Sequence, residues 1–518
     1  MQSCDVAKAS ICVLITLLLI RAAPDAMAQN TPNVRSAGRK FDLSELRAQA
    51  NTNQVVVKFR EGEKVRVANQ KLTGMRSGQA NLLNNVLRQV GVTETALTPL
   101  FEAPPEELDR DRSEGQRRSG RELADLSLYF VITLPPTASA AEVANNLNTL
   151  PFVEYARPAL RPAPPPIYSI PKAANPLPEG DAARASSPNL TPWQTYKGKA
   201  PPGIGPIPNV KGSDGRGMSF ADVEYDWTLT HEDLRISSLR ALETELTPDR
   251  FGGPEHGTAV LGILSSLPNS FGVTGIAPGA LAYVAAASSK ELGYQPARAI
   301  GIAMNKLRAG DVLVIEQQAP VCGLEDYGPL EYYQDMFDAV SAATAKGIVV
   351  VAAAGNGDVN LDRDTCSGAF DRSKRDSQAI IVGAGSSTDR SRMSFSSYGS
   401  RVDVQGWGEN VTTTGYGDAY NPTNDVRRYY TKSFNGTSSA TPIVAGTVLV
   451  IQSVRKACGL PPATPLEMRD LLVRTGTRQG SPGAPNIGPL PNLEAALKAS
   501  VPANCLRPMQ SASDAAVP

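Results

Sequence analysis

Imidazole, the usual general base of enzymes near neutral pH, is available at only two positions of this chain. His256 stands in the stretch EHGTAVLGIL, which begins a predicted apolar helix, and His231 stands in the loop motif THEDL. A serine hydroxyl is a weak nucleophile that needs a base within hydrogen-bond reach and an acid that orients the base. Ser438, in NGTSSATPIVAG, offers such a hydroxyl where another apolar helix begins. Helix capping is the alternative role for hydroxyls at that position.

The acid of such a triad has to come from elsewhere in the chain. Asp222 follows the predicted strand GMSFAD directly and precedes His256 and Ser438 in the sequence. All three fall at junctions between predicted strands and helices, and the carboxyl ends of parallel strands meet at one edge of a sheet. Esterases of the α/β-hydrolase type run Ser–Asp–His and carry GxSxG, which is absent here. The order Asp–His–Ser therefore predicts a different class of serine hydrolase.

A fourth polar residue is placed to bind a developing negative charge. The stretch VVAAAGNGD predicts a buried strand that ends in Gly-Asn-Gly, which puts Asn356 at the carboxyl end of that strand. Its side-chain amide and the backbone N–H of Ser438 are the two donors that an oxyanion hole needs. We expect Asn356 to stabilise the oxyanion of a tetrahedral intermediate.

The elements that position these groups alternate between strand and helix over residues 191–500. The runs Ile348–Ala354 and Ala379–Ala384 are continuously apolar, which is typical of strands buried on both faces of a parallel sheet. Helical patterns lie between such runs, at His256–Leu267, Pro296–Arg308 and Leu330–Lys346. We predict an α/β domain whose mostly parallel sheet is covered by helices, followed by a tail at residues 501–518.

Residues 53–158 form a second and smaller predicted domain. Gln54–Arg60, Leu128–Leu134 and Phe152–Pro158 are strand-like, whereas Gln79–Val90 and Ser139–Leu150 have helical spacing. The element order strand, helix, strand, strand, helix, strand is the split βαβ pattern. The sequence therefore predicts a small α+β domain of ferredoxin-like type.

The N-terminus and the region between the two domains carry processing signals. Lys8, the apolar run Ile11–Ile20 and the sequence AMA at residues 26–28 predict a secretory signal peptide, residues 1–28. Ten apolar residues are too few to cross a bilayer, and we expect no later segment to do so. Residues 159–190 are rich in proline and read as an extended linker with a processing region. We expect a soluble product that is secreted, either to a periplasm or outside the cell.

The charge composition does not indicate a strongly charged partner. The chain has 51 basic and 51 acidic residues, so its net charge gives no indication of nucleic-acid binding. Four cysteines remain after the signal peptide, and an even number in an exported protein favours disulfides. Three pairings are possible; proximity in sequence favours Cys322–Cys366 and Cys458–Cys505, with free buried thiols as the alternative. Metal binding by these cysteines is not expected, because no CxxC pair or histidine cluster accompanies them.

The motifs NGTSSATP, HGT and AAAGN, together with the strand that leads to Asp222, resemble the subtilisin-like serine endopeptidases. The resemblance covers residues 191–500 and implies a subtilisin-like three-layer fold. It also implies that Ser438 attacks the peptide carbonyl, that His256 transfers the proton and that Asp222 holds the imidazole tautomer. Residues 53–158 look like the inhibitory propeptide of that family, which implies inhibition of the active site and removal by cleavage; an independent binding domain is the alternative.

The sequence departs from the family around the acid. Members of the family usually show Asp-Ser/Thr-Gly, whereas this chain has ADVEYDW. We assign the role to Asp222, keep Asp226 as the fallback, and find no task for Glu224. In sedolisin-type peptidases Glu replaces the histidine and Asp replaces the oxyanion asparagine. This chain retains both His256 and Asn356, so that alternative is not favoured.

The substrate-binding segment of the family, usually Ser-Leu-Gly, matches IEQQAP here. An edge strand at that place implies main-chain pairing with an extended substrate. The opposite wall is implied at Ala352–Gly355. Glu316 suggests a preference for a basic residue before the scissile bond, and the alternative is a carboxyl buried in a local network. The implied substrate-binding residues are Ile315, Glu316, Gln317, Ala353, Ala354 and Gly355.

A structural calcium site is also implied by the resemblance. Asp233 matches the carboxylate ligand of the family, and the stretch LPNSFGV matches its ligand loop. A mixture of carboxylate, amide and carbonyl oxygens suits Ca²⁺. A tight turn without an ion is the alternative. The implied ligands are Asp233, Leu267, Asn269, Phe271 and Val273.

These observations predict a secreted serine endopeptidase that acts on proteins or peptides through an acyl-enzyme and is made as a precursor inhibited by its own propeptide. A catalytically inactive binding protein on the same scaffold is the second hypothesis, and an ester hydrolase is the third. Inactive relatives of enzymes generally lose a member of the triad, and no member is missing here. Hydrolysis of casein distinguishes a peptidase from an esterase.

Overall fold

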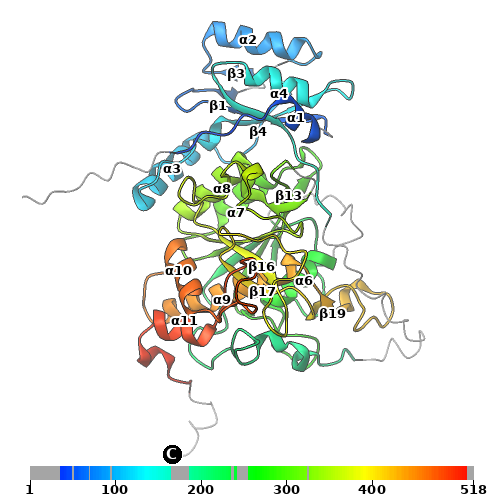
Figure 1. The fold of residues 1–518 in the computed structure, drawn as a ribbon, viewed down its shortest axis with the longest axis vertical. Helices are drawn as coiled ribbons and strands as arrows, with labels where there is room; N and C mark the ends of the chain where they lie inside the picture. Colours follow the sequence, from blue (N-terminus) through cyan, green and yellow to red (C-terminus); the bar gives the residue numbers. More distant parts are fainter. Residues whose placement is uncertain are drawn as a thin grey trace, which may run out of the picture.

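The structure is a computed structural model that describes residues 35–49, 52–68, 71–93, 96–164, 186–234, 239–241, 255–323 and 326–509. The predicted signal peptide, residues 165–185 of the predicted linker and residues 510–518 of the tail lie outside these ranges. Figure 1 shows two parts: an N-terminal module, residues 35–158, lies over a larger α/β part and faces its helices α7 (Pro296–Lys306) and α8 (Gln334–Ala345).

The N-terminal module is built on a four-stranded antiparallel sheet in the order β4-β5-β1-β6. With one helix between β1 and β4 and one between β5 and β6, this is the predicted ferredoxin-like arrangement. A further helix, α3, follows β4 and packs against α8. The elements are α1 (Leu43–Gln49), β1 (Gln54–Phe59), β2 (Arg66–Ala68), β3 (Lys71–Thr73), α2 (Ser77–Arg88), β4 (Leu97–Pro99), α3 (Pro105–Ser119), β5 (Tyr129–Thr133), α4 (Ala140–Asn148) and β6 (Val153–Pro158).

The larger part contains a seven-stranded sheet in the order β17-β16-β15-β12-β7-β9-β8, and every neighbouring pair within it is parallel. The predicted α/β fold with a parallel sheet is therefore confirmed. The strands are β7 (Ser219–Glu224), β8 (Leu239–Ala241), β9 (Leu281–Ala286), β12 (Val312–Ile315), β15 (Val349–Ala353), β16 (Ile380–Gly385) and β17 (Val404–Trp407).

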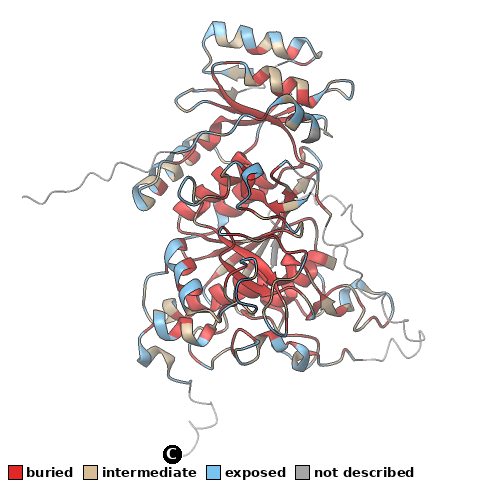
Figure 2. Ribbon diagram, viewed as in Figure 1, coloured by how far each residue is buried: buried red, intermediate tan, exposed pale blue. Residues whose placement is uncertain are grey.

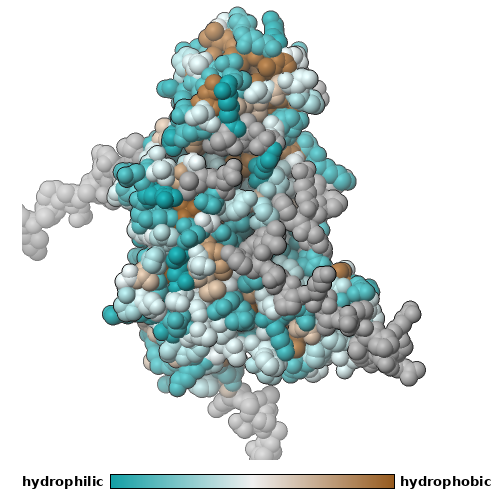
Figure 3. Space-filling view, turned by 45° about the vertical axis from the view of Figure 1, so that its right-hand side comes forward, coloured by the Kyte–Doolittle hydropathy of each residue, from teal (hydrophilic) through white to brown (hydrophobic). Residues whose placement is uncertain are grey.

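Helices cover both faces of this sheet. Along β12, Leu313 and Ile315 belong to the core that includes α7 and α8, whereas Val312 and Val314 belong to the core that includes α6 (Glu255–Ser265) and α9 (Thr437–Ala457). Successive side chains of a strand point to opposite faces, so each strand feeds both cores. The sheet and its covering helices are buried in Figure 2, whereas α2 is largely exposed. The face seen in Figure 3 is mostly polar.

Helix α9 is the central helix of the larger part. Its 21 residues are long and apolar enough to cross a membrane, contrary to our expectation that no later segment reaches that length. The apolar window is wholly buried inside the protein, as is typical of the core helix of a soluble fold. Two further helices, α10 (Pro465–Thr475) and α11 (Leu493–Ser500), pack beside it.

Both favoured disulfides are formed in the structure. Cys322–Cys366 closes a loop next to the short hairpin of β13 (Gln318–Pro320) and β14 (Tyr327–Pro329), and Cys458–Cys505 joins the end of α9 to the segment after α11. Two other small hairpins complete the larger part: β10 (Ser288–Ser289) with β11 (Gly293–Tyr294), and β18 (Val411–Thr414) with β19 (Tyr430–Phe434).

Candidate active site

The carboxyl end of β7 brings an acid to His256, but the acid is Glu224. The Oε2 atom of Glu224 lies 3.1 Å from Nδ1 of His256. Ala221 and Val223 belong to the core on the α7/α8 side of the sheet. Because side chains alternate along a strand, Glu224 points to the other face, where α6 begins.

The structure does not bring Asp222, which we expected beside His256, into contact with that ring. Its Oδ2 accepts a hydrogen bond from Nε1 of Trp227 at 2.8 Å, and its Oδ1 has no hydrogen-bond partner among the described residues. The reason is the length of β7, which continues two residues beyond the predicted end and finishes at Glu224. Asp222 therefore lies inside the strand. The fallback, Asp226, lies beyond the strand and bonds the N–H of Trp227.

A buried chain of hydrogen bonds holds the Glu224 carboxylate. Nε2 of Gln317 donates to Oε1 of Glu224 at 3.2 Å. The hydroxyl of Tyr294 donates in turn to Oε1 of Gln317 at 3.0 Å. Gln317, which was expected to line the substrate pocket, also bonds the acid that faces His256.

His256 is the second residue of α6, and its ring packs edge-on against Phe434 with 5.5 Å between the ring centroids. Its Nε2 is buried and has no hydrogen-bond partner in the part of the chain that the structure describes. This nitrogen is free to act as a base once Nδ1 carries the proton toward Glu224. His231, by contrast, lies away from this group: its Nε2 is 2.9 Å from the carbonyl oxygen of Tyr429.

Ser438 is the second residue of α9, and it follows a tight turn in which Gly436 has φ of +91°. A left-handed φ suits glycine because it has no Cβ. No side-chain hydroxyl caps this helix, and Ser439 bonds the carbonyl oxygens of Trp407 and Gly436. The capping alternative for Ser438 is therefore not seen. Ser438 lines one small hollow together with His256 and Glu224.

Asn356 follows β15 and lies beside the N-terminus of α9. Its Oδ1 accepts the N–H of Thr437, the residue before Ser438, at 2.8 Å. In the structure this Nδ2 donates to Oε1 of Gln318 at 3.3 Å. The amide is thus held between the start of α9 and Gln318, which lines the hollow.

The predicted substrate walls are only partly brought together at the hollow. Glu316 and Gln317 line it, along with Gln318 and Tyr225, which sequence reasoning did not assign. Ile315 packs into the core on the α7/α8 side, and Ala353 and Ala354 are buried. Gly355 has φ of +91°, and an added Cβ would lie 2.7 Å from the Cα of Gly328.

The segment that follows the N-terminal module, residues 159–164, lies across the same hollow. The hydroxyl of Tyr225 donates to the carbonyl oxygen of Ala163 at 2.8 Å, and Nε2 of Gln318 donates to that of Pro164 at 3.0 Å. With these residues in place about 10 Å³ of space remains, which is about enough for one water molecule. No pattern of polar residues in the sequence predicts these contacts, because the contacts depend on how the module docks.

The residues implied as calcium ligands are brought together, and the side-chain oxygens of Asp233 and Asn269 accept hydrogen bonds in the structure. Oδ1 of Asp233 accepts a hydrogen bond from Nδ2 of Asn269 at 2.8 Å, and Oδ2 accepts the N–H of Val273 at 2.7 Å. Oδ1 of Asn269 accepts the N–H of Phe271 at 3.0 Å, and the carbonyl oxygen of Leu267 accepts the N–H of Asn269 at 3.0 Å. Burial raises the pKa of Asp233 to about 7. These oxygens of Asp233, Leu267 and Asn269 accept hydrogen bonds from N–H groups and so hold a hydrogen-bonded turn.

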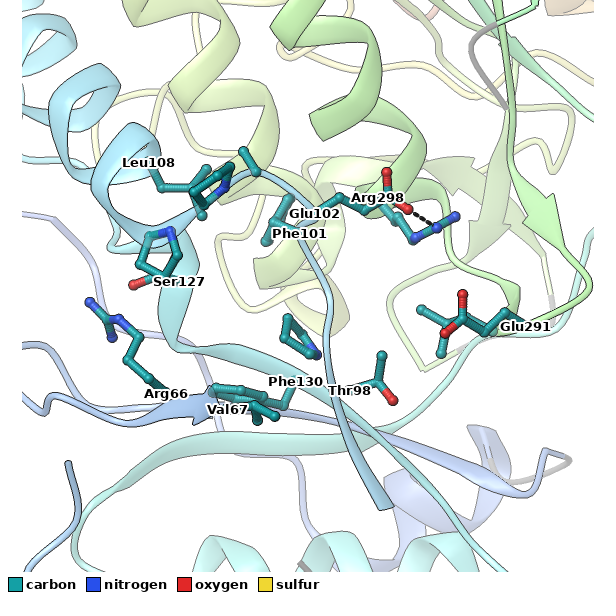
Figure 4. A pocket seen from close by; sticks show the side chains of 15 residues that line it. Arg66, Val67, Thr98, Phe101, Glu102, Leu108, Ser127, Phe130, Glu291 and Arg298 are labelled. Atoms are coloured by element: carbon teal, nitrogen blue, oxygen red, sulfur yellow. Dashed lines mark hydrogen bonds and ion pairs between the residues drawn. The ribbon is translucent and has the colours of Figure 1, made fainter. Parts of the chain in front are cut away.

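A larger hollow of about 370 Å³ lies elsewhere, between the module and α7 (Figure 4). Phe101, Phe130 and Arg66 line it from the module, and Glu291 and Arg298 line it from the larger part. An ion pair between Glu102 and Arg298 spans the two parts at its rim. None of the residues around Ser438 lines this hollow, so it belongs to the interface.

A serine and an imidazole that line one hollow, with a carboxylate at the imidazole, at the carboxyl edge of a parallel sheet, are the arrangement typical of serine hydrolases. A family model described as the subtilase family (peptidase S8) matches residues 239–487, a range that begins after β7. An alkaline protease of Alkalihalobacillus alcalophilus is 30% identical over 323 residues, which cover 62% of this chain and 73% of that protein. Subtilisin Savinase of Lederbergia lenta is 31% identical over 310 residues, covering 59% of this chain and 98% of the relative.

Fervidolysin from Fervidobacterium pennivorans, described as a keratinolytic enzyme related to subtilisin, shares the fold with a TM-score of 0.55. That comparison covers 90% of this chain and 64% of fervidolysin at 19% identity. The chain therefore belongs to the subtilase family and is a subtilisin-like serine peptidase.

Proposed function

We propose that the protein is a secreted endopeptidase, made as a self-inhibited precursor, with Glu224, His256 and Ser438 as its catalytic triad. The observation that carries the proposal is the position of His256. Its Nδ1 lies 3.1 Å from the Glu224 carboxylate, and its ring lines the same hollow as Ser438. Catalytic hydrogen bonds are often long in the absence of substrate, so the Nε2–Oγ contact is expected to tighten when a peptide binds.

In the acylation step, Ser438 Oγ attacks the carbonyl carbon of the scissile peptide bond while Nε2 of His256 takes the hydroxyl proton. Glu224 accepts the Nδ1–H of the ring, which fixes the tautomer and stabilises the imidazolium. His256 then gives the proton to the leaving amine nitrogen, and the C–N bond breaks to leave an acyl ester on Ser438. Water, deprotonated by the same imidazole, hydrolyses that ester and restores the serine.

The negative charge on the carbonyl oxygen is expected to bind Nδ2 of Asn356 and the backbone N–H of Ser438. Replacing Asn356 by Leu removes one donor and is expected to lower kcat by roughly 10²–10³-fold, with a much smaller change in KM, because the bond forms in the transition state. Steady-state kinetics on a peptide substrate measure both constants. A rise in KM at constant kcat would instead assign Asn356 to substrate binding.

The segment after the module, residues 159–164, supports self-inhibition. Leu160 and Ala163 are buried, and the carbonyl oxygens of Ala163 and Pro164 are bound by Tyr225 and Gln318, beside Ser438. A peptide substrate needs the space that this segment fills. We therefore propose that residues 53–158 are an inhibitory propeptide domain that stays docked until the linker is cut.

The prolines in residues 161–166 indicate which peptide bonds are not cleaved during processing. Residues 161–166 read Arg-Pro-Ala-Pro-Pro-Pro, so the bonds from Ala163 to Pro166 all have proline on the leaving side. The proline ring fixes φ and removes the N–H, which constrains the approach of such a bond to the triad. We propose that processing takes place further along residues 159–190, beyond Pro166.

The test uses the full precursor and its Ser438→Ala form. We expect the native chain to hydrolyse casein, to be labelled by a fluorophosphonate probe and to lose its N-terminal region by intact-mass measurement. The Ser438→Ala form is expected to do none of these. Labelling at another residue, or equal casein hydrolysis by both forms, would overturn the proposal.

A further inference from the structure

Three carboxyl groups gather on one face of two neighbouring strands, although a triad needs only one. Asp222 and Glu224 lie two residues apart on β7, and Glu316 follows β12 directly. In the parallel pairing Val314 lies opposite Asp222 and Ile315 opposite Val223, so Glu316 comes next to Glu224. All three are buried: the exposed fractions are 0% for Asp222, 1% for Glu224 and 4% for Glu316.

The three carboxyls differ in their partners. Glu224 is bonded to Gln317 and lies against His256. Both oxygens of Glu316 and Oδ1 of Asp222 are buried without a hydrogen-bond partner among the described residues. An ionised carboxylate in such a place is strongly disfavoured by the loss of hydration, and neighbouring carboxylates cannot all ionise together. The orphaned oxygens therefore point to retained protons.

We propose that Asp222 and Glu316 are a proton-retaining pair, in which neutral Glu316 positions the Ser438 hydroxyl and leaves Glu224 as the single negative charge at His256. This inference rests on the proposed triad and deepens it. Neither residue takes a proton from substrate; both act by positioning other groups. Glu316 was also considered as the cause of a preference for a basic residue before the scissile bond. Its burial beside Asp222 makes it a poor counter-charge for a basic substrate side chain.

The surroundings of the pair agree with neutral carboxyls. Burial, reinforced by Glu224, raises the pKa of Asp222 well above its usual range, against a smaller lowering by the bond from Trp227. Burial, with Asp222 and Glu224, raises the pKa of Glu316 in the same direction, and the Ser438 hydroxyl lowers it. Glu316 and Ser438 line the same small hollow, which is the geometric basis for their interaction.

The titratable and charged groups around the pair come from four elements. Strand β7 contributes Glu224 and is followed directly by the phenol of Tyr225, and the segment after β12 contributes only the neutral Gln317 and Gln318. Helix α6 contributes His256, and helix α9 contributes the hydroxyl of Ser438. No Lys or Arg is among the residues that line the hollow, so no lysine or arginine charge there favours ionisation of the pair.

A consequence for activity follows from this arrangement. While the pair is protonated, Ser438 can turn its hydrogen toward Nε2 of His256. When the pair ionises in alkaline solution, Glu316 competes for that hydrogen as an acceptor, and a second negative charge opposes the oxyanion. The activity of the processed enzyme is therefore expected to fall on the alkaline side of its pH profile.

The experiment measures kcat and kcat/KM from pH 5 to 11 for the processed native enzyme and for Glu316→Gln. The amide keeps the size and the neutral hydrogen-bonding capacity of the acid but cannot ionise. We expect the alkaline fall to move upward by about one pH unit or more in E316Q, while the acid limb, which reports His256, stays in place. Asp222→Asn, which can still accept from Trp227, is expected to shift the same limb.

Asp311→Asn is the matched control, because Asp311 is also a buried carboxyl with a raised pKa but lies at the other end of β12. It bonds the N–H groups of Ser219 and Arg308. D311N is expected to leave the alkaline limb unchanged. The proposal is overturned if the alkaline fall in activity lies at the same pH in the native enzyme, E316Q and D222N. It is also overturned if D311N shifts that fall equally. A native enzyme without activity or labelling contradicts the triad instead.

For a variant that is processed poorly, the stability of the precursor is the second measurement. A carboxyl whose pKa is raised in the folded state binds more protons folded than unfolded, so its contribution to stability declines as pH rises from about 4 toward the folded pKa. In the Ser438→Ala precursor, E316Q is therefore expected to gain stability relative to Glu316 between pH 5 and 9, measured as Tm. A difference in Tm that does not vary with pH overturns the proposal.

Discussion

Replacing Glu224 by Gln is expected to lower kcat by roughly 10⁴-fold at pH 7, the largest effect of any substitution outside Ser438 and His256. The amide of Gln presents an N–H₂ or a neutral oxygen to Nδ1 of His256. The N–H₂ group favours the tautomer with hydrogen on Nε2, which cannot take the proton of Ser438. The neutral oxygen gives little stabilisation to the imidazolium that forms during attack. Single-turnover kinetics on an acylating ester measure the loss.

Asp222→Asn is the matched comparison, because it makes the same chemical change two residues away on the same face of β7. Asp222 bonds Trp227 and does not contact His256. We expect D222N to change kcat at pH 7 by less than about tenfold. A loss in D222N as large as that in E224Q would return the acid role to Asp222. Circular dichroism and Tm establish that both variants are folded.

Glu224→Asp tests the geometry of the same contact. Shortening the side chain by one methylene draws the carboxylate back from Nδ1, now 3.1 Å away, but keeps its charge. Catalytic groups need positions fixed to within about 0.5 Å. E224D is therefore expected to retain more activity than E224Q and less than the native enzyme. This order separates the loss of charge from the loss of position.

The sequence was sufficient for the general architecture because local patterns and distant contacts agree in this fold. Continuous apolar runs such as Ile348–Ala354 predicted buried parallel strands, and the structure has β15 at Val349–Ala353. The hydroxyl-rich start of α9 and the histidine at the start of α6 were assigned from motifs, and the structure brings both to one hollow. Helix starts are marked locally by turn residues, which is why these positions were accessible.

The acid was misplaced because the end of a strand is not marked as sharply. The sequence FADVEYDW offers three carboxyls within five residues, and only the register of β7 decides which one faces His256. Alternation puts both Asp222 and Glu224 on the same face, so a pattern of period two cannot separate them. The continued apolar spacing through Val223 was the available signal that β7 extends to Glu224.

Contacts that depend on docking were beyond the sequence. Gln318 reads as part of an edge strand, yet its side chain holds the carbonyl oxygen of Pro164 and meets Asn356. The same is true of Arg157 on β6 and Asp335 on α8, which lie 178 residues apart in the chain. Charged residues on separate elements carry no local signature of their pairing. Such pairs emerge only when the two parts are placed against each other.

Breaking the buried ion pair between Arg157 and Asp335 is expected to release the inhibition of the precursor. Nη2 of Arg157 lies 2.6 Å from Oδ2 of Asp335, and Nε lies 3.2 Å from Oδ1, so the two groups meet by two parallel bonds. The side chains are 1% and 0% exposed. The hydroxyl of Tyr155 also donates to Asp335, at 3.2 Å, and the guanidinium lies over the ring of Tyr333.

Arg157→Met keeps much of the volume but leaves the Asp335 carboxylate buried without its cation. Such a change typically costs about 3–5 kcal/mol, which corresponds to roughly 150- to 5,000-fold in an equilibrium constant. The cost falls on the docked state, because undocking returns Asp335 to water. The basal peptidase activity of the unprocessed precursor is therefore expected to rise by a factor in that range, up to the activity of the free enzyme.

Arg47→Met is the control for this prediction, because Arg47 forms an ion pair with Glu142 within the same module but at the surface. The two side chains are 64% and 44% exposed, and pairs of that kind contribute less than about 1 kcal/mol. Peptide hydrolysis is measured before the linker is cut, as judged by intact mass. If the Arg157→Met precursor hydrolyses peptide no faster than the Arg47→Met precursor, the module is not held by this pair.

Asp335→Asn approaches the same pair from the enzyme side and separates docking from catalysis. Asp335 lies on α8, on the opposite face of the sheet from Ser438, so the processed D335N enzyme is expected to retain its activity. Its precursor is expected to be active before processing, because Arg157 then lacks a full counter-charge. Loss of activity in processed D335N would mean that α8 supports the active site as well as the module, since the module has already left.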